Sequence, residues 1–259
     1  MDKLRIGFIG FGNMAQAMAR GLLRGACAPE QLCACAAHYD ALCLRTEPLG
    51  IRALRDPCQV AEAADLLVLA VLPENVPEIA VQLKDKLRGK MLLSVVAGLD
   101  YERCEALFPG SHHISTIPNT PISVGQGVLI CQERHSLTPE EYQCFAALLG
   151  QIALVETVPD AAFSAGGTLG GCTPAFAALF MEALGDAGVR YGIPREAAYR
   201  IAAQVLVGSG SLLLESGQHP GQLKDAVCSP GGSTIRGVEA LEQAAFRGAL
   251  LAAFRAIEG

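Results

Sequence analysis

Two glycine-rich segments of this chain have residue types and spacings that could bind anions. The first follows the pattern G-x-G-x-x-A from Gly10 to Ala15, between a short apolar run and a segment with helical periodicity. In that setting Gly10 permits a tight turn, Gly12 lets the backbone approach a pyrophosphate, and Ala15 allows close packing of helix on strand. The amides at the start of the helix add donors and positive potential. The segment therefore predicts a dinucleotide-binding site.

The second segment runs from Ser229 to Thr234, where a proline and two glycines precede a helix that begins with two hydroxyl side chains. A turn of this kind can aim successive backbone N–H groups outward and bind a carboxylate. In the alternative interpretation Ser233 or Thr234 is only a helix N-cap, which explains one hydroxyl but not the pair of glycines. We therefore predict a carboxylate-binding turn.

The end of the second predicted strand bears on the choice of cofactor. An NAD site usually carries a carboxylate there, about 20 residues after the glycine turn, to bind the ribose hydroxyls. The segment around Cys35 and Ala36 has none, and Asp40 lies later in the chain. This favours NADP(H), with NAD(H) as the alternative. No Lys or Arg stands at the strand end to meet a 2′-phosphate, and the nearest is Arg45.

The thiols and imidazoles predict no metal site. The chain has 10 cysteines but no C-x-x-C pattern, and its 5 histidines include only one adjacent pair, His112-His113. Structural zinc needs closely spaced ligand pairs. We expect the histidine pair to lie in an exposed loop. Cys172 lies in a glycine turn, but no histidine is near it in sequence, and we do not expect it to act as a nucleophile.

The first half of the chain alternates between predicted strands and helices that would position these segments. The predicted strands are Leu4–Ile9, Leu32–Ala36, Leu66–Leu72, Met91–Val96, Ile114–Ile117, Val128–Ile130 and Ala153–Glu156. Helical patterns cover Asn13–Leu23, Val76–Leu87 and Tyr101–Phe108, and a further helix starts after Thr138. This alternation is typical of an α/β fold with a doubly wound parallel sheet.

The second half is predicted to be all helical, over residues 160–170, 174–190, 195–216, 220–226 and 233–257. We therefore expect two domains, residues 1–158 and 159–259. Residues 161–181 and 201–214 contain no charged side chain, but glycines and Pro174 interrupt the first stretch and the second is short for a membrane span. A helix that is apolar all round is usually buried. We predict burial against a second copy, in an obligate homodimer, and no membrane span.

Composition excludes several classes of protein. A chain of 259 residues with 51% hydrophobic side chains is too apolar to be disordered and can bury a sizeable core. The net charge of −6 and the lack of a basic run predict no binding to nucleic acid or to anionic lipid. Residues Met1–Arg5 lack the features of a signal peptide, so we expect a cytoplasmic protein. A mean hydropathy of +0.33 fits a buried subunit interface.

These segments together with several others resemble the pyrroline-5-carboxylate reductase family. The matching segments, spread along nearly the whole chain, are Gly10-Phe11-Gly12-Asn13-Met14, Leu69-Ala70-Val71-Leu72-Pro73, Ser94-Val95-Val96-Ala97-Gly98, Pro118-Asn119-Thr120-Pro121, Gly171-Cys172-Thr173-Pro174-Ala175-Phe176, Glu182–Val189, Gly192-Ile193-Pro194-Arg195 and Ser229-Pro230-Gly231-Gly232-Ser233-Thr234-Ile235. The resemblance implies an N-terminal Rossmann domain, followed by an all-α domain that interlocks with its partner into a homodimer. A higher oligomer of such dimers is the alternative assembly. It also implies reduction of 1-pyrroline-5-carboxylate to L-proline.

The resemblance assigns residues to both ligands. The cofactor is expected to contact Gly10, Gly12, Asn13, Met14, Ala36, Ala70, Val71, Leu72, Pro73, Ala97, Gly98 and Asn119. The cyclic imine acid is expected to contact Asn119, Cys172, Thr173, Gly231, Gly232, Ser233 and Thr234. Its carboxylate would bind backbone N–H groups of the second turn, and the Thr234 hydroxyl would face the ring nitrogen as the catalytic group. An iminium carbon is already electrophilic, so orientation and one hydrogen bond serve hydride transfer better than a strong acid does.

The chain departs from the family pattern at several of these positions. Leu72 stands where the family usually has Lys, Ser115 where it has Arg, and Pro57 where Asn is common. Thr173 and Phe176 alter the turn that approaches the substrate. Two alternatives therefore stay open: a reductase of a different cyclic imine acid, and a nucleotide-binding member without this activity. The related β-hydroxyacid dehydrogenases use a Lys early in the second domain, but no Lys occurs between Lys90 and Lys224.

Overall fold

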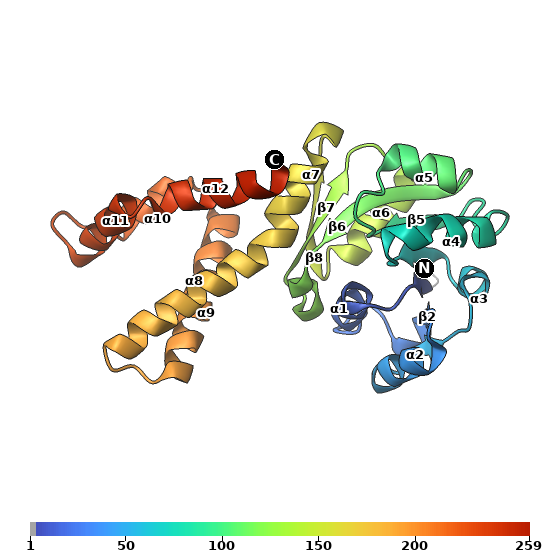
Figure 1. Ribbon diagram of the computed structural model, residues 1–259, viewed down its shortest axis with the longest axis horizontal. Coiled ribbons are helices and arrows are strands. Elements are labelled where there is room, and N and C mark those ends of the chain that lie inside the picture. Colours follow the sequence, from blue (N-terminus) through green and yellow to red (C-terminus); the bar gives the residue numbers. More distant parts are fainter. Residues whose placement is uncertain (1–3) are drawn as a thin grey trace. The chain divides into compact units, whose positions relative to one another are not determined.

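The computed structural model describes residues 4–259, and the chain divides into two compact units (Figure 1). The first unit ends at Pro174, and the second comprises Ala175–Gly259. The boundary expected between residues 158 and 159 marks the change from strand to helix. As a domain boundary it stays a prediction.

An eight-stranded sheet forms the centre of the first unit. Its strands are β1 (Ile6–Ile9), β2 (Leu32–Cys35), β3 (Arg52–Ala53), β4 (Leu66–Leu69), β5 (Met91–Ser94), β6 (His112–Pro118), β7 (Gly127–Gln132) and β8 (Ala153–Val158). They are ordered β3-β2-β1-β4-β5-β6-β7-β8, and all pairs from β3 to β6 are parallel. The strand order reverses between β1 and β4, as in doubly wound sheets. The predicted fold class is confirmed.

Strand β7 runs against its neighbour β6, with Thr116 opposite Cys131 and Pro118 opposite Leu129. Only residues 119–126, with the short turn η4 (Thr120–Val124), connect the two strands. A parallel return needs a crossover of about a dozen residues or more, so this connection permits only the antiparallel direction. Strand β8 is again parallel to β7. The sheet is therefore parallel at every pairing except that of β6 with β7.

Helices cover both faces of the sheet (Figure 1). Helices α1 (Asn13–Leu22), α2 (Tyr39–Thr46) and α6 (Pro139–Leu149) contribute to the core cluster that includes Phe8 and Val68. Helices α3 (Pro57–Ala63), α4 (Val76–Leu83) and α5 (Tyr101–Leu107) contribute to the cluster that includes Leu67 and Leu69. Successive strand residues point to opposite faces, which divides the core in this way. Short turns η1 (Pro29–Gln31), η2 (Glu47–Leu49) and η3 (Pro73–Asn75) complete the connections.

The first uncharged stretch packs against the sheet of its own chain. It forms the turn η5 (Asp160–Ala162), helix α7 (Phe163–Gly167) and a π-helical turn η6 (Thr168–Cys172). A Cβ added at Gly167 would lie 2.3 Å from Ile117 Cδ1, and one at Gly170 would lie 3.2 Å from Ile130 Cγ1. A side chain at either glycine would therefore force the isoleucine that it meets to shift. The sheet, rather than a second copy alone, accounts for the missing charges here.

The second unit contains most of α8 (Thr173–Arg190) and the helices α9 (Arg195–Ser216), α10 (Pro220–Ala226), α11 (Ser233–Gln243) and α12 (Phe246–Glu258). The predicted single helix over 233–257 is broken, because Ala245 adopts a left-handed conformation with φ of 55°. Helices α8 and α9 pack closely at Gly185, where an added Cβ would lie 2.3 Å from the Tyr199 ring.

Helix α9 exposes much of its apolar surface within one chain. Val205, Val207, Leu212 and Leu214 are each more than half exposed. In the part of the chain that the structure describes, α9 alone is long and apolar enough to span a membrane by length and composition. Only 11% of its apolar stretch is buried. This exposed apolar surface is the kind of surface that a second copy would cover.

The histidine pair lies at the start of β6, so the expectation of an exposed loop is wrong. The His113 side chain is 0% exposed, and its Nε2 is 3.0 Å from Glu105 Oε2. His112 Nδ1 is 2.7 Å from Glu141 Oε1. His135 stacks on the Tyr142 ring with centroids 4.9 Å apart. The Nδ1 atoms of His113 and His135 are buried and have no hydrogen-bond partner within residues 4–259.

We expect His135 to make stability depend on pH. Burial lowers the pKa of its imidazole from 6.5, and the nearby His113 lowers it further. The unfolded chain therefore binds a proton at His135 more readily than the folded chain does. The contribution of neutral His135 to the free energy of unfolding is complete above about pH 6.5 and is lost as pH falls below that value. His135→Phe keeps a stacked ring without a titrating group. It should therefore reduce the loss of folding stability that the wild type shows as pH falls below about 6.5. Urea unfolding at a series of pH values measures the effect.

His38→Gln is the matched control, because His38 is exposed and its side chain does not cap α2. This variant should keep the wild-type pH dependence between about pH 7.5 and 5. If the stability of His135→Phe depends on pH as that of the wild type does, His135 is not the source of this pH dependence.

Candidate functional site

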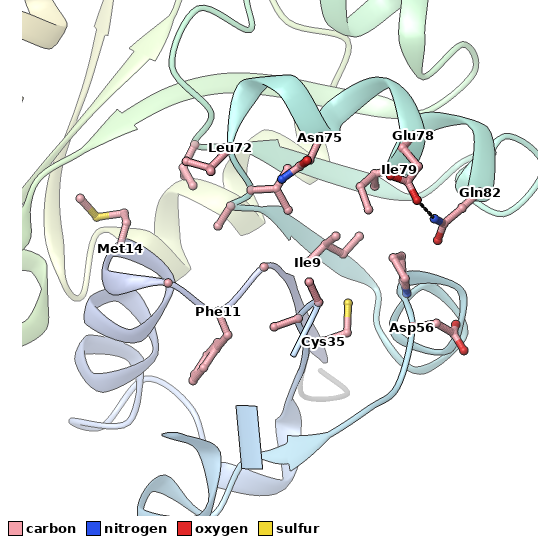
Figure 2. A pocket seen from close by; sticks show the side chains of 18 of the residues that line it. Ile9, Phe11, Met14, Cys35, Asp56, Leu72, Asn75, Glu78, Ile79 and Gln82 are labelled. Carbon is pink, nitrogen blue, oxygen red and sulfur yellow. Dashed lines mark hydrogen bonds between the residues drawn. The ribbon is translucent and has the colours of Figure 1, made fainter. Parts of the chain in front are cut away.

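A cleft of about 690 Å³ lies at the carboxyl ends of β1, β2 and β4 (Figure 2). This is where the strand order reverses, the usual position of ligands in open α/β sheets. Figure 2 shows Phe11 and Met14 on the side of the glycine turn, and Glu78, Ile79 and Gln82 on the side of α4. Eight of the residues predicted to contact the cofactor line the cleft: Gly10, Gly12, Asn13, Met14, Ala36, Ala70, Val71 and Leu72.

The glycine turn is held between the ends of β2 and β4. Gly10 has φ of 87°, its N–H donates to the Cys35 carbonyl at 2.9 Å, and the Ala70 N–H donates to the Ile9 carbonyl at 2.8 Å. A Cβ at Gly10 would lie 2.4 Å from the Ala70 carbonyl oxygen. Both the left-handed conformation and this close approach require glycine.

Gly12 has a different role, because it is the N-cap of α1 and its surroundings are open. It has φ of −77° and no side chain that could accept a hydrogen bond from the first helical N–H groups, and an added Cβ would meet nothing within 4 Å. No acidic side chain lies in the first turn of α1, so the positive end of the helix is not neutralised there. Asn13 and Met14 in this turn line the cleft. The arrangement fits a pyrophosphate at the start of the helix.

The cleft also contains charged residues, of which only Arg45 was noted from the sequence. Arg45, Arg55 and Asp56 line it together with Ala36 and Ala37 at the end of β2. The strand end itself carries no Lys or Arg, as the sequence indicated, but the fold brings Arg45 and Arg55 to the cleft beside it. Helix α2 and the segment after β3 fold back onto β2 and bring both side chains to the cleft. Neither element was predicted, and no spacing rule links these arginines to the glycine turn.

Four other residues assigned to the cofactor lie outside the lining of the cleft. Pro73 begins the turn η3 after β4. Ala97 and Gly98 form an exposed turn after β5, the neighbouring strand. Gly98 has φ of 70°, and its carbonyl accepts a hydrogen bond from Arg103 Nη1 at 2.6 Å. These three residues lie at the same edge of the sheet as the cleft, because parallel strands end together there. Their contact with a cofactor stays a prediction.

Asn119, the fourth, is only 6% exposed and is bonded within the fold. Its Nδ2 donates to the Gly170 carbonyl at 2.9 Å, and its Oδ1 accepts the Val128 N–H at 2.9 Å. The Thr173 hydroxyl donates to the Leu169 carbonyl, and Cys172 ends the π-helical turn. These bonds place the η6 turn on β6 and β7. Contacts of Asn119, Cys172 and Thr173 with a ligand stay predictions.

The second anion-binding segment lies in the second unit. Gly231 has φ of 69°, and Gly232 is the N-cap of α11 without a side-chain hydrogen bond. The interpretation of Ser233 or Thr234 as the N-cap is therefore wrong, and both lie exposed in the first helical turn. Arg236 Nη1 donates to the Gly231 carbonyl at 3.0 Å, which steadies the turn. The N–H groups at the start of α11 are thus free of a side-chain cap and fit a carboxylate.

Comparison with known families assigns both parts of the chain. Residues 160–258 match the pyrroline-5-carboxylate reductase dimerisation model. Residues 5–98 match the model of NADP oxidoreductases that depend on coenzyme F420. The helical region that begins near Asp160 is therefore similar to a dimerisation domain, and the glycine turn lies within a dinucleotide-binding domain.

Full-length relatives agree with these matches. The chain is 44% identical to a pyrroline-5-carboxylate reductase of Treponema pallidum, over 98% of each chain. The solved structure of a pyrroline-5-carboxylate reductase from Coxiella burnetii superposes with a TM-score of 0.88 at 29% identity, covering 99% of this chain and 96% of that one. The Plasmodium falciparum pyrroline carboxylate reductase with NADP bound gives a TM-score of 0.86 at 26% identity, with the same coverage.

The two glycines of the turn should respond differently to alanine. Gly10→Ala should lower the free energy of unfolding by about 2 kcal/mol or more, because φ is positive and the Ala70 carbonyl is in contact. Gly12→Ala should change stability by about 1 kcal/mol or less, yet weaken NADPH binding by placing a methyl group where the pyrophosphate is expected. Urea unfolding and fluorescence titration with NADPH measure the two effects. Wild-type NADPH affinity in Gly12→Ala would rule out a pyrophosphate at this position.

Proposed function

Because the chain belongs to the pyrroline-5-carboxylate reductase family, we propose that it reduces 1-pyrroline-5-carboxylate to L-proline with NADP(H) as the cofactor. The observation that carries this conclusion is the 44% identity to a reductase of that name over 98% of both chains. Two features of the structure support it: the cleft at the glycine turn, and the start of α11 at Gly232, which has no side-chain cap. NAD(H) is the alternative cofactor.

The cleft fits a dinucleotide by its volume and by its donors. Its 690 Å³ lies within the usual range of about 300–1,000 Å³ for ligand pockets. The open space at Gly12 leaves room for a pyrophosphate, which Asn13 and Met14 would meet through backbone amides at the start of α1. Ala70, Val71 and Leu72 would lie along the nucleotide from the end of β4. Bound NADPH supplies a hydride.

The substrate needs little acid–base chemistry from the chain. The imine carbon gains the hydride, the C=N double bond becomes single, and the ring nitrogen carries the proton of the protonated imine. The turn Gly231–Thr234 binds the carboxylate through backbone N–H groups and thereby orients the ring. The Thr234 hydroxyl hydrogen-bonds the ring nitrogen. Orientation and this single hydrogen bond suffice because the iminium carbon is already electrophilic.

The departures from the family pattern differ in their structural setting. Leu72 is 62% exposed at the cleft, so the usual lysine could stand there without disturbing the core. Ser115 is buried in β6 with its hydroxyl 3.6 Å from Cys104 Sγ, where an arginine would not fit without rearrangement. The altered residues Thr173 and Phe176 support the second candidate, reduction of a different cyclic imine acid.

The helical region supports a homodimer. Residues 160–258 match a dimerisation model, and α9 exposes apolar side chains over much of its length. A subunit contact accounts for this surface better than lipid does, so the enzyme is proposed to be soluble and to act in the cytoplasm. Assembly of dimers into a higher oligomer is the further possibility that the family resemblance suggests.

Turnover with pyrroline-5-carboxylate is the direct test of the reaction. The purified protein with NADPH should consume reduced nicotinamide at about 1 s⁻¹ or faster, an ordinary enzyme rate. A panel of six-membered cyclic imine acids is assayed in parallel. Faster turnover of a six-membered ring would support the second candidate. NADPH binding without turnover of any imine would instead identify a nucleotide-binding member without this activity.

Thr234 and Ser233 form a matched pair, since both hydroxyls lie exposed in the first turn of α11. Thr234→Ala should lower kcat about tenfold to a hundredfold, the effect of one hydrogen bond made in the transition state, with NADPH affinity unchanged. Ser233→Ala should leave kcat within about twofold, and Thr234→Ser should retain most of it. Equal losses in both alanine variants would show disruption of the helix start rather than loss of a catalytic hydroxyl.

Light scattering should report a mass of twice the 27.1 kDa chain at micromolar concentration. Val207→Asp combined with Leu214→Asp places two charges on the exposed apolar face of α9, and should shift the population to monomer. Val81→Asp is the control, because Val81 is 77% exposed on α4 outside the matched dimerisation region. A wild-type monomer, or a dimer unaffected by the α9 charges, would contradict this interface.

A further inference from the structure

We propose that Arg45 and Arg55 bind the 2′-phosphate of the cofactor and set the preference of this enzyme for NADPH over NADH. The proposal rests on the proposed function only in that the cleft holds a nicotinamide dinucleotide. It concerns two side chains at the end of β2 that line the cleft beside Ala36 and Ala37.

The two arginines come from different elements that meet at this strand end. Arg45 is in the last turn of α2, and its Nη1 donates to the Phe11 carbonyl of the glycine turn at 3.2 Å. Arg55 follows β3, and the Leu54 N–H next to it donates to the Ala34 carbonyl of β2 at 2.8 Å. The end of the second strand is where the adenosine ribose of a dinucleotide lies in this fold. Both guanidinium groups are therefore placed on the side of the ribose 2′ position.

Neither guanidinium is neutralised by an ion pair with another described residue. The bond from Arg45 goes to a neutral carbonyl, and Arg55 lies over the Tyr39 ring with its Cζ 4.2 Å from the centroid. Stacking of this kind uses the face of the guanidinium and leaves the N–H groups at its edge available. Five donors on each group exceed what these contacts use, and arginine suits a phosphate through paired N–H bonds.

Two carboxylates also line the cleft, and both have partners in their own segments. Asp56 Oδ1 accepts the Gln59 N–H at 2.9 Å as the N-cap of α3. Glu78 Oε1 accepts from Gln82 Nε2 at 3.3 Å, on the α4 side of the cleft (Figure 2). Neither occupies the strand end itself, which is formed by Ala36 and Ala37. If the cofactor were NADH, Asp56 would be the carboxylate that could reach the ribose hydroxyls.

Adenosine 2′,5′-bisphosphate and AMP isolate the proposed contact, because they differ only in the 2′-phosphate. Calorimetry with the full-length protein should show that the bisphosphate binds at least about tenfold more tightly than AMP, as expected for one charge-assisted contact. Arg45→Gln and Arg55→Gln should each remove much of this difference, and the double variant should abolish it. AMP affinity should stay within about twofold in all of them. NADPH and NADH titrations should give the same pattern.

Arg52→Gln is the matched control, since Arg52 is exposed on β3 and lies outside the cleft. It should bind both probes as the wild type does. Arg45→Lys and Arg55→Lys keep the charge without the paired donors and should give intermediate preferences. If the wild-type protein binds adenosine 2′,5′-bisphosphate and AMP with equal affinity, the proposal is wrong. A parallel loss of both probes in the glutamine variants would also overturn it, by showing that the arginines only brace the cleft wall.

The outcome is separable from that of the reductase assay. Discrimination by the 2′-phosphate through these arginines, without turnover of any imine, would leave this proposal standing and overturn the proposed reaction. Suppose instead that the enzyme reduces pyrroline-5-carboxylate equally well with NADH and NADPH, and that substitution of either arginine changes neither rate. This result would overturn the proposal for the arginines and leave the proposed reaction standing.

Discussion

The contact between the Gly10 backbone and the Ala70 carbonyl is the constraint on which the nucleotide cleft depends. The register pairs Ile9 with both Cys35 and Leu69, so β1, β2 and β4 end at the same level. Hydrogen bonds across these ends then hold the turn so tightly that no side chain fits at Gly10. The start of α1 is aimed at the cleft as a consequence, with open space beside Gly12.

Both candidate anion sites of this enzyme rely on backbone amides at the start of a helix. Helices α1 and α11 each begin at a glycine N-cap without a side-chain hydrogen bond. Backbone donors do not change when side chains are substituted, which is consistent with the departures from the family pattern at Leu72 and Thr173. Side chains are proposed to add selectivity instead: two arginines line the cleft at the end of β2, and one threonine hydroxyl lies exposed in the first turn of α11.

The two uncharged stretches show how similar compositions can serve different kinds of packing. Glycines of α7 and η6 let that segment lie against Ile117 and Ile130 of its own sheet. In α8 and α9, small residues such as Gly185 lie where the helices contact each other, while large side chains such as Val207 and Leu214 stay exposed. Burial of that second set needs a partner, as the match to a dimerisation model indicates.

Local patterns alone determined the glycine turn, most strands, the late helices and the family resemblance, because turn geometry and hydrophobic periodicity are properties of neighbouring residues. Helices α2 and α3 and strand β3 are short and carry weak periodicity, so they escaped prediction. Packing of these elements onto β2 decided that Arg45 and Arg55 reach the cleft. Packing likewise buried His113 at the start of β6. Such meetings depend on contacts between residues far apart in the chain, which only the tertiary structure brings together.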